Sequence, residues 1–99
     1  MEHYILVKWN PDAGNREELA QQAERLFQDA CRMPGISRTE LFRNCVEREN
    51  RYDLMIRMEL EPDALERFDR SEIHSEWKRR FGEKIEKKAI FDCFGRERK

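Results

Sequence analysis

The sequence predicts an α+β fold in a single domain spanning residues 1–99, with a core over about residues 3–94. Short segments rich in β-forming residues alternate apolar and polar side chains with a period of two. Longer segments between them repeat apolar residues every three or four positions, as amphipathic helices do. The segments follow one another as strand, helix, strand, strand, helix, strand. This order predicts an antiparallel four-stranded sheet with its helices on one face.

The first half of the chain predicts a central strand followed by a long helix. Residues 3–9 are rich in β-formers and stop at Asn10. Both faces of this strand are largely apolar, so we expect it to be covered on both sides. Residues 15–32 predict an amphipathic helix with Asn15 as its N-cap. The turn Met33-Pro34-Gly35 should end this helix.

The second half predicts two strands, a broken helical segment and a last strand. Residues 36–46 form a more polar strand, which we place nearer an edge of the sheet. Strict alternation over residues 52–60 predicts the third strand. A short helix begins near Pro62, and a second helical piece follows a break at residues 70–72. Residues 88–94 predict the last strand. The complete β-α-β-β-α-β order is the ferredoxin-like arrangement.

One face of this sheet has no helices to cover it, although its residues are largely apolar. A contiguous apolar face is not stable in water, and pairing with a second copy about a two-fold axis is the usual solution. We therefore expect a homodimer. The predicted interface residues are Tyr4, Leu6, Met55, Phe91 and Cys93.

Composition excludes several classes of protein. A net charge of −1 gives no overall field for nucleic acid, and no apolar run approaches the roughly 18 residues of a membrane helix. The three cysteines, Cys31, Cys45 and Cys93, have no C-x-x-C spacing, so we expect neither disulfides nor a zinc site. We interpret them as reduced, core-filling residues of a cytoplasmic protein.

Several motifs recur together along residues 3–94 and resemble those of one family. They are His3 to Lys8 (H-x-x-x-x-K), Met33-Pro34-Gly35-Ile36, Arg43-Asn44, Tyr52-Asp53-Leu54, His74 and Ile90-Phe91-Asp92. In this order and spacing they resemble the stress-responsive A/B barrel domain, a family of dimeric α/β barrels. The resemblance implies two ferredoxin-like protomers whose sheets close into a shared barrel. It implies much less about activity, because function does not follow from fold.

The resemblance also implies where a site would lie. The family includes heat-stable oligomeric plant proteins and one polyketide cyclase, the olivetolic acid cyclase, which carries out a cofactor-free aldol cyclisation between sheet and helices. Its pocket histidines correspond to His3 and His74 here. The tyrosine beside its helical histidine corresponds to Phe68, and a further pocket histidine corresponds to Leu54, so this chain departs from the cyclase at both positions.

The two histidines also suit acid/base chemistry on their own account. A neutral imidazole can accept a proton from a carbon acid or enol near pH 7. We take His74 as the preferred base and His3 as the residue that orients the substrate, while Asp92 is placed to orient a histidine. Purely structural roles for both histidines remain open. The predicted pocket is lined by Ile5, Val7, Leu54, Ile56, Phe68, Trp77 and Ile90.

Three functions remain open from the sequence. The first is cofactor-free acid/base chemistry, of the cyclase or lyase type, on a small carbonyl compound. The second is a non-catalytic module that binds a small ligand or serves as a stable oligomer, with its pocket filled by its own side chains. The third, which we favour least, is a haem- or quinone-type monooxygenase of a related dimeric barrel. We expect no cofactor and no metal, because no other ligand lies at suitable spacing to the two histidines.

Overall fold

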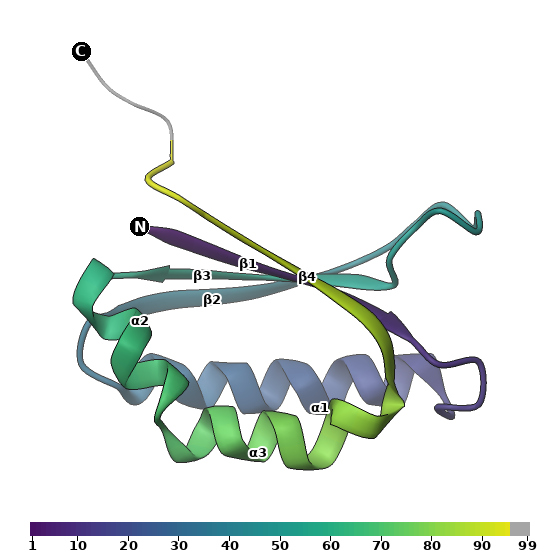
Figure 1. The fold of residues 1–99 in the computed structure, drawn as a ribbon, viewed down its shortest axis with the longest axis horizontal. Helices are drawn as coiled ribbons and strands as arrows, with labels where there is room; N and C mark the ends of the chain where they lie inside the picture. The colour runs from purple at the N-terminus through teal and green to yellow at the C-terminus, as the bar shows by residue number, and fades with distance from the viewer. Residues whose placement is uncertain (96–99) are drawn as a thin grey trace.

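The computed structural model describes residues 1–95, and the last four residues of the predicted domain lie outside the described part. Two short 3-10 turns, Ala30–Arg32 and Gly82–Lys84, follow the first and the last helix. The strands and helices are β1 (Glu2–Trp9), α1 (Arg16–Asp29), β2 (Ile36–Arg43), β3 (Leu54–Leu60), α2 (Pro62–Asp69), α3 (Glu72–Phe81) and β4 (Ile85–Cys93) (Figure 1). This element order confirms the ferredoxin-like prediction.

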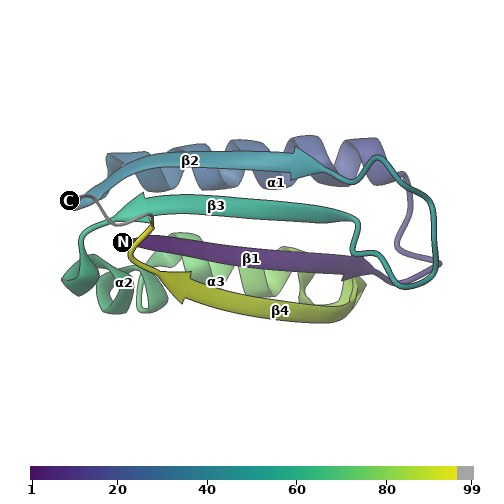
Figure 2. The same ribbon diagram turned by 90° about the horizontal axis from the view of Figure 1, so that it is seen from above.

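The four strands form one antiparallel sheet in the order β2-β3-β1-β4 (Figure 2). β1 is central, as predicted, while β2 and β4 are the two edges. The register pairs His3 with Met58 on one side and with Asp92 on the other. A bulge between Lys8 and Trp9 bends the start of β4 against β1.

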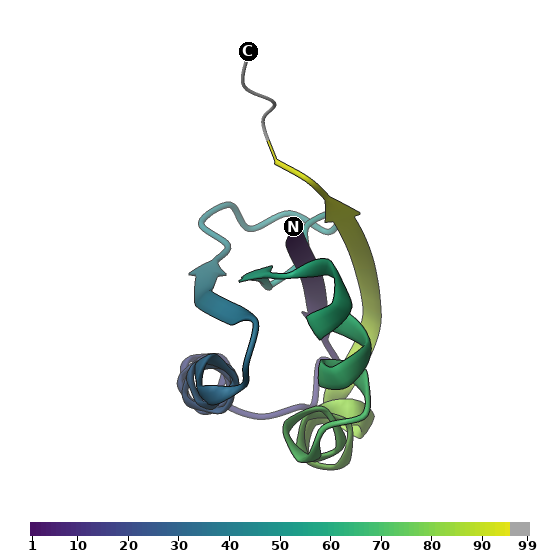
Figure 3. The ribbon, with the colours of Figure 1, turned by 90° about the vertical axis from the view of Figure 1, so that its left-hand side faces the viewer.

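All three helices lie on one face of the sheet (Figure 3). α1 lies beneath the β2 side, and the α2–α3 pair lies beneath the β4 side. Aromatic rings join these helices: the ring centres of Phe27 in α1 and Trp77 in α3 are 5.0 Å apart in an edge-on contact, and those of Trp77 and Phe81 are also 5.0 Å apart. The core forms where the alternating apolar face of β1 and β3 meets these rings.

The opposite face of the sheet carries no helix and exposes apolar side chains. By register, Phe42, Met55, Leu6 and Ala89 form a row across all four strands. Two aromatic side chains on this face are exposed to solvent: Phe42 is 45% exposed and Phe91 is 60% exposed. The uncovered face expected from the sequence is therefore present.

Three strand boundaries differ from the prediction. β2 ends at Arg43 rather than at residue 46, because the Asn44 side chain bonds both the N–H and the carbonyl of Val46 in a turn. β3 begins at Leu54 rather than at residue 52. β4 spans Ile85–Cys93 rather than residues 88–94. Its first half is charged, so the apolar pattern did not indicate where the strand begins.

The prediction that the cysteines fill the core is wrong. Cys31 and Cys45 are exposed and Cys93 is half-buried, and all three are free thiols. Cys31 lies in the turn after α1 and Cys45 in the loop after β2, and neither segment contributes its cysteine side chain to the interior.

Candidate functional site at the β4 edge

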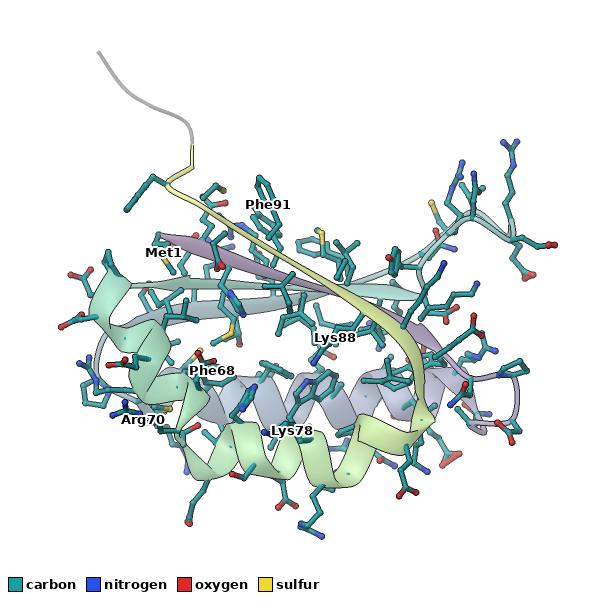
Figure 4. The ribbon with its side chains drawn as sticks, in the orientation of Figure 1. Met1, Phe68, Arg70, Lys78, Lys88 and Phe91 are labelled. Atoms are coloured by element: carbon teal, nitrogen blue, oxygen red, sulfur yellow. The ribbon has the colours of Figure 1, made fainter. Side chains whose placement is uncertain are left out.

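A close contact joins a buried histidine to a carboxylate. His3 is only 6% exposed and is the one buried polar or charged side chain among the described residues. Its Nδ1 lies 2.5 Å from Oδ1 of Asp92, its cross-strand partner on β4. Both side chains lie on the helix-facing side of the sheet, because Phe91, the neighbour of Asp92 along β4, points to the other side (Figure 4). The ladder between β1 and β4 thus fixes the pair.

His74 is placed by the start of α3. Ser71 is the N-cap, and its hydroxyl accepts from the His74 backbone N–H at 3.1 Å while donating to the Phe68 carbonyl. The imidazole packs edge-on against the Phe68 ring, with 5.3 Å between the ring centres. Its Nδ1 atom is buried and has no hydrogen-bond partner among the described residues. An unpaired buried nitrogen of this kind is uncommon in folded proteins.

Burial also lowers the pKa of His74, because the imidazolium form is poorly solvated there. The charges of Lys78 and Lys88 lower this pKa further, whereas Asp69 opposes the shift through its charge and its backbone. The His74 ring is therefore neutral near pH 7 and available as a hydrogen-bonding or proton-transfer group.

The edge strand leaves this region open to solvent. Along the helix-facing side of β4 the side chains are Lys88, Ile90 and Asp92, which stand opposite Val7, Ile5 and His3. Ile90 is 49% exposed and the Asp92 side chain 40% exposed, whereas Val7 and Ile5 are buried. We call these four groups (Lys88, Ile90, Asp92 and His3), together with His74, whose pKa the Lys88 charge lowers, the β4 site.

The other residues of the predicted pocket belong to the packed interior. With the exception of Ile90, each is at most 3% exposed: Ile5, Val7, Leu54, Ile56, Phe68 and Trp77. Two cavities lie at the other end of the sheet, away from the β4 site. One, of about 660 Å³, lies beneath the loop at residues 44–53 and is walled by charged side chains such as Lys8 and Arg16. The other, of about 390 Å³, lies on the uncovered face beside Phe42, Tyr52 and Met55.

The predicted interface carries a polar cluster beside its apolar row. Arg57 reaches Glu40 at 2.8 Å, Glu59 at 2.9 Å and Glu2 at 3.2 Å. The Tyr4 hydroxyl donates to the Glu2 carboxylate, which raises the pKa of Tyr4 and lowers that of Glu2. Tyr4 therefore has hydrogen-bond partners that the sequence spacing did not indicate.

Two features of the β4 site are not evident from the sequence. The run of basic residues around Lys88 does not show which way each side chain points, and the structure places Lys88, which is exposed, on the helix-facing side of β4 (Figure 4). Its place could have been found from the two-residue period that links it to Ile90 and Asp92. The sequence suggests Asp92 as a partner for a histidine without indicating which one, and the structure pairs it with His3. Among residues 1–95, no group of three or more metal-ligating side chains gathers.

No protein-family model matches this chain, and no curated protein matches it. Among solved structures, a dimeric ferredoxin-like protein of unknown function from Thermobifida fusca is similar, with 14% identity and a TM-score of 0.75. That match covers 91% of this chain and 85% of the other. A dabb family protein from Mesorhizobium loti has 19% identity and a TM-score of 0.61, covering 95% and 96% of the two chains.

A third similar structure is an enzyme. The hydroxynitrile lyase from Passiflora edulis has 11% identity and a TM-score of 0.71, and the match covers 91% of this chain and 87% of the lyase. The chain has the ferredoxin-like fold of these proteins. At such low identity the likeness shows the fold, and it is consistent with the stress-responsive A/B barrel family that the sequence resembles. No helix within residues 1–95 has the length and apolar character needed to cross a membrane.

Proposed function

We propose that this protein is a homodimeric enzyme that transfers a proton on a small carbonyl compound without a cofactor. The observation that carries the proposal is the 2.5 Å contact between Nδ1 of buried His3 and the Asp92 carboxylate. An ionised carboxylate only accepts hydrogen bonds, so in this proposal His3 donates its Nδ1–H to Asp92, which in the neutral ring leaves a lone pair on Nε2. This arrangement favours His3 as the base, which exchanges the roles expected from the sequence for His3 and His74.

In the proposed step, Nε2 of His3 removes a proton from the carbon next to the carbonyl group. The electron pair of that C–H bond forms the C=C bond of an enolate, and the carbonyl oxygen takes up the negative charge. The imidazolium then returns the proton to carbon or to oxygen, so no oxidant or reductant is consumed. Asp92 stabilises the imidazolium in between. Neutral His74 supplies a second imidazole for a hydrogen bond to the substrate oxygen.

The fold of a hydroxynitrile lyase supports this class of chemistry. Release of cyanide from a hydroxynitrile also begins with the removal of a proton, in that case from a hydroxyl group. The carbon–carbon bond then breaks as the carbonyl group forms, and cyanide leaves with the electron pair. A base held by a carboxylate serves both reactions, and neither one requires a metal.

The uncovered sheet face supports the dimer. Phe42 and Phe91 expose aromatic surface on it, and the loop at residues 44–53 and the end of β4 both rise on this side (Figure 1). The cavity of about 390 Å³ near Tyr52 opens on the same face and offers a recess for side chains of a second copy. Structural neighbours described as dimeric agree with this pairing. Three free thiols support a reducing, cytoplasmic location.

Deuterium exchange tests the proposal without knowledge of the natural substrate. The purified protein is incubated in D2O with methyl 5-oxohexanoate, and loss of the protons next to the ketone is followed by NMR. We expect exchange above the buffer rate in the wild type, and strongly reduced exchange in H3Q. Exchange that is absent from the wild type, or unchanged in H3Q, would contradict the proposal.

The second candidate is a non-catalytic module, and one observation favours it. Six of the seven predicted pocket residues are at most 3% exposed, so the interior between sheet and helices is filled by its own side chains. In that case the dimer still forms, no exchange occurs, and H3Q lowers stability without altering any activity. The exchange experiment therefore separates the two candidates.

A further inference from the structure

The helix-facing side of β4 combines a cation, an apolar residue and an anion in one line. Lys88, Ile90 and Asp92 alternate along this side, so each is separated from the next by one residue that faces the other way. Residues four apart in a strand lie roughly 13 Å apart along it. Lys88 and Asp92 therefore mark the two ends of a strip with exposed Ile90 at its centre.

Lys88 differs from its neighbour Lys87 in what it contacts. Lys87 lies over the Tyr52 ring, 5.8 Å from the ring centre, on the uncovered side of the sheet. Lys88 is exposed, points toward the helices, and makes no ion pair with any residue in the described range (Figure 4). On the neighbouring strand β1, Lys88 pairs with Val7, which is fully buried. Because Lys88 is exposed and unpaired among the described residues, its ammonium group is free to bind an anion from solution.

We propose that Lys88 binds a carboxylate of the substrate, so that the protein prefers oxo acids to neutral ketones. This inference rests on the proposed function and names the substrate class of the same site. The carbon chain would lie along Ile90, and the ketone would reach His3 beside Asp92. The Asp92 charge sets the orientation of the bound acid. It repels the substrate carboxylate, which can then bind only at the Lys88 end of the strip. The spacing suits an acid whose carboxylate and ketone are a few carbons apart.

The binding of 5-oxohexanoate, compared with that of its methyl ester, tests this proposal. Both molecules carry the same ketone and chain, and only the acid carries a charge. Binding is measured by NMR from the backbone amide shifts of β4 and from the His74 ring protons. Because Lys88 is exposed, we expect the acid to bind about three- to fivefold more tightly than the ester at low salt. This preference should shrink as the salt concentration rises.

Two lysine variants complete the test. K88Q should bind acid and ester equally, whereas K87Q, altered at the adjacent position on the other face, should keep the wild-type preference. Equal binding of the two probes to the wild type, no binding of either, or a preference that survives in K88Q would overturn the assignment. A failure of the proposed function would look different. In that case the probes would bind at β4, with the acid preferred, but neither would undergo deuterium exchange.

Discussion

His3 and Asp92 face each other across the β1–β4 ladder with Nδ1 and Oδ1 2.5 Å apart, one side chain buried and the other open to solvent. This asymmetry matters for chemistry. The buried imidazole lies opposite Asp92 in the β1–β4 ladder, while the half-exposed carboxylate lies at the β4 edge, where the proposed function places the substrate. In the proposed reaction the pair would join a fixed base to an accessible surface.

The first prediction concerns Asp92. D92N keeps the size of the side chain but replaces an acceptor of the Nδ1–H by an amide, which no longer stabilises the imidazolium. We expect the rate of deuterium exchange to fall by about a hundredfold, within the range attributed to a positioned acid/base group. The free energy of unfolding should change by less than about 1 kcal/mol, because Asp92 is half-exposed. A D92N protein that exchanges at the wild-type rate would exclude a role for the pair in catalysis.

The second prediction concerns pH and His74. Because burial lowers its pKa in the folded state below the ordinary 6.5, the unfolded chain binds the proton more readily than the folded chain. The contribution of His74 to stability is therefore complete above about pH 6.5 and is lost as the pH falls toward the folded-state pKa. Urea unfolding at pH 7.5 and pH 5.0 measures this loss.

The charged groups around His74 define the control. Lys78 and Lys88 lower its pKa, and Asp69 raises it. H74Q should lose a distinct part of the acid destabilisation, while K88Q should retain most of it, since burial is the larger cause. If H74Q and the wild type lose stability equally on acidification, the partly buried His74 ring is not desolvated enough in solution to lower its pKa.

The third prediction concerns the uncovered face. Leu6 lies at the centre of the apolar row, and an aspartate there would bring two charges into an apolar contact between copies. We expect L6D to weaken the dimer by about two orders of magnitude or more. R25D, on the exposed surface of α1, is the matched control and should leave the dimer intact. Native mass spectrometry measures the oligomeric state of both variants and of the wild type. A wild-type protein that is monomeric would contradict the paired-sheet proposal.

The fourth prediction concerns the turn before β2. Gly35 has a φ of +88°, and a Cβ at this position would lie 2.9 Å from Cβ of Ala64 in α2. G35A should therefore destabilise the protein by about 2 kcal/mol. G82A is its control, because Gly82 has helical backbone angles and a methyl group there would meet open space. Similar unfolding curves for the two variants would show that the turn relaxes without cost.

The fold could be predicted from the sequence because its central elements have clear periods. β3 alternates strictly in sequence and β1 is rich in β-forming residues, and the inward residues of both strands, His3–Trp9 and Leu54–Leu60, are all buried. The edge strand β4 could not be placed as well, because it is exposed on both sides for most of its length and its apolar pattern is weak. Sequence periodicity reports burial, so an unburied strand gives little signal.

The site could be predicted only in part, for a different reason. His3 and His74 stand out as chemically suitable residues, but residue type does not show which partner each one has. The pairing of His3 with Asp92 depends on the register between the first and last strands, which brings together residues 89 positions apart in the chain. Likewise, the burial of six predicted pocket residues reflects the way α1 and α3 pack against the sheet.

The central claim is that Asp92 holds His3 with its proton on Nδ1 and its lone pair on Nε2. Nitrogen-15 NMR of the imidazole rings at pH 7.5 measures this directly, with H74Q used to assign the two histidines. We expect the neutral His3 ring to be protonated at Nδ1 in the wild type and to lose this preference in D92N. A His3 ring protonated at Nε2 in the wild type would contradict the account, because no lone pair would then be available to take the proton from a substrate.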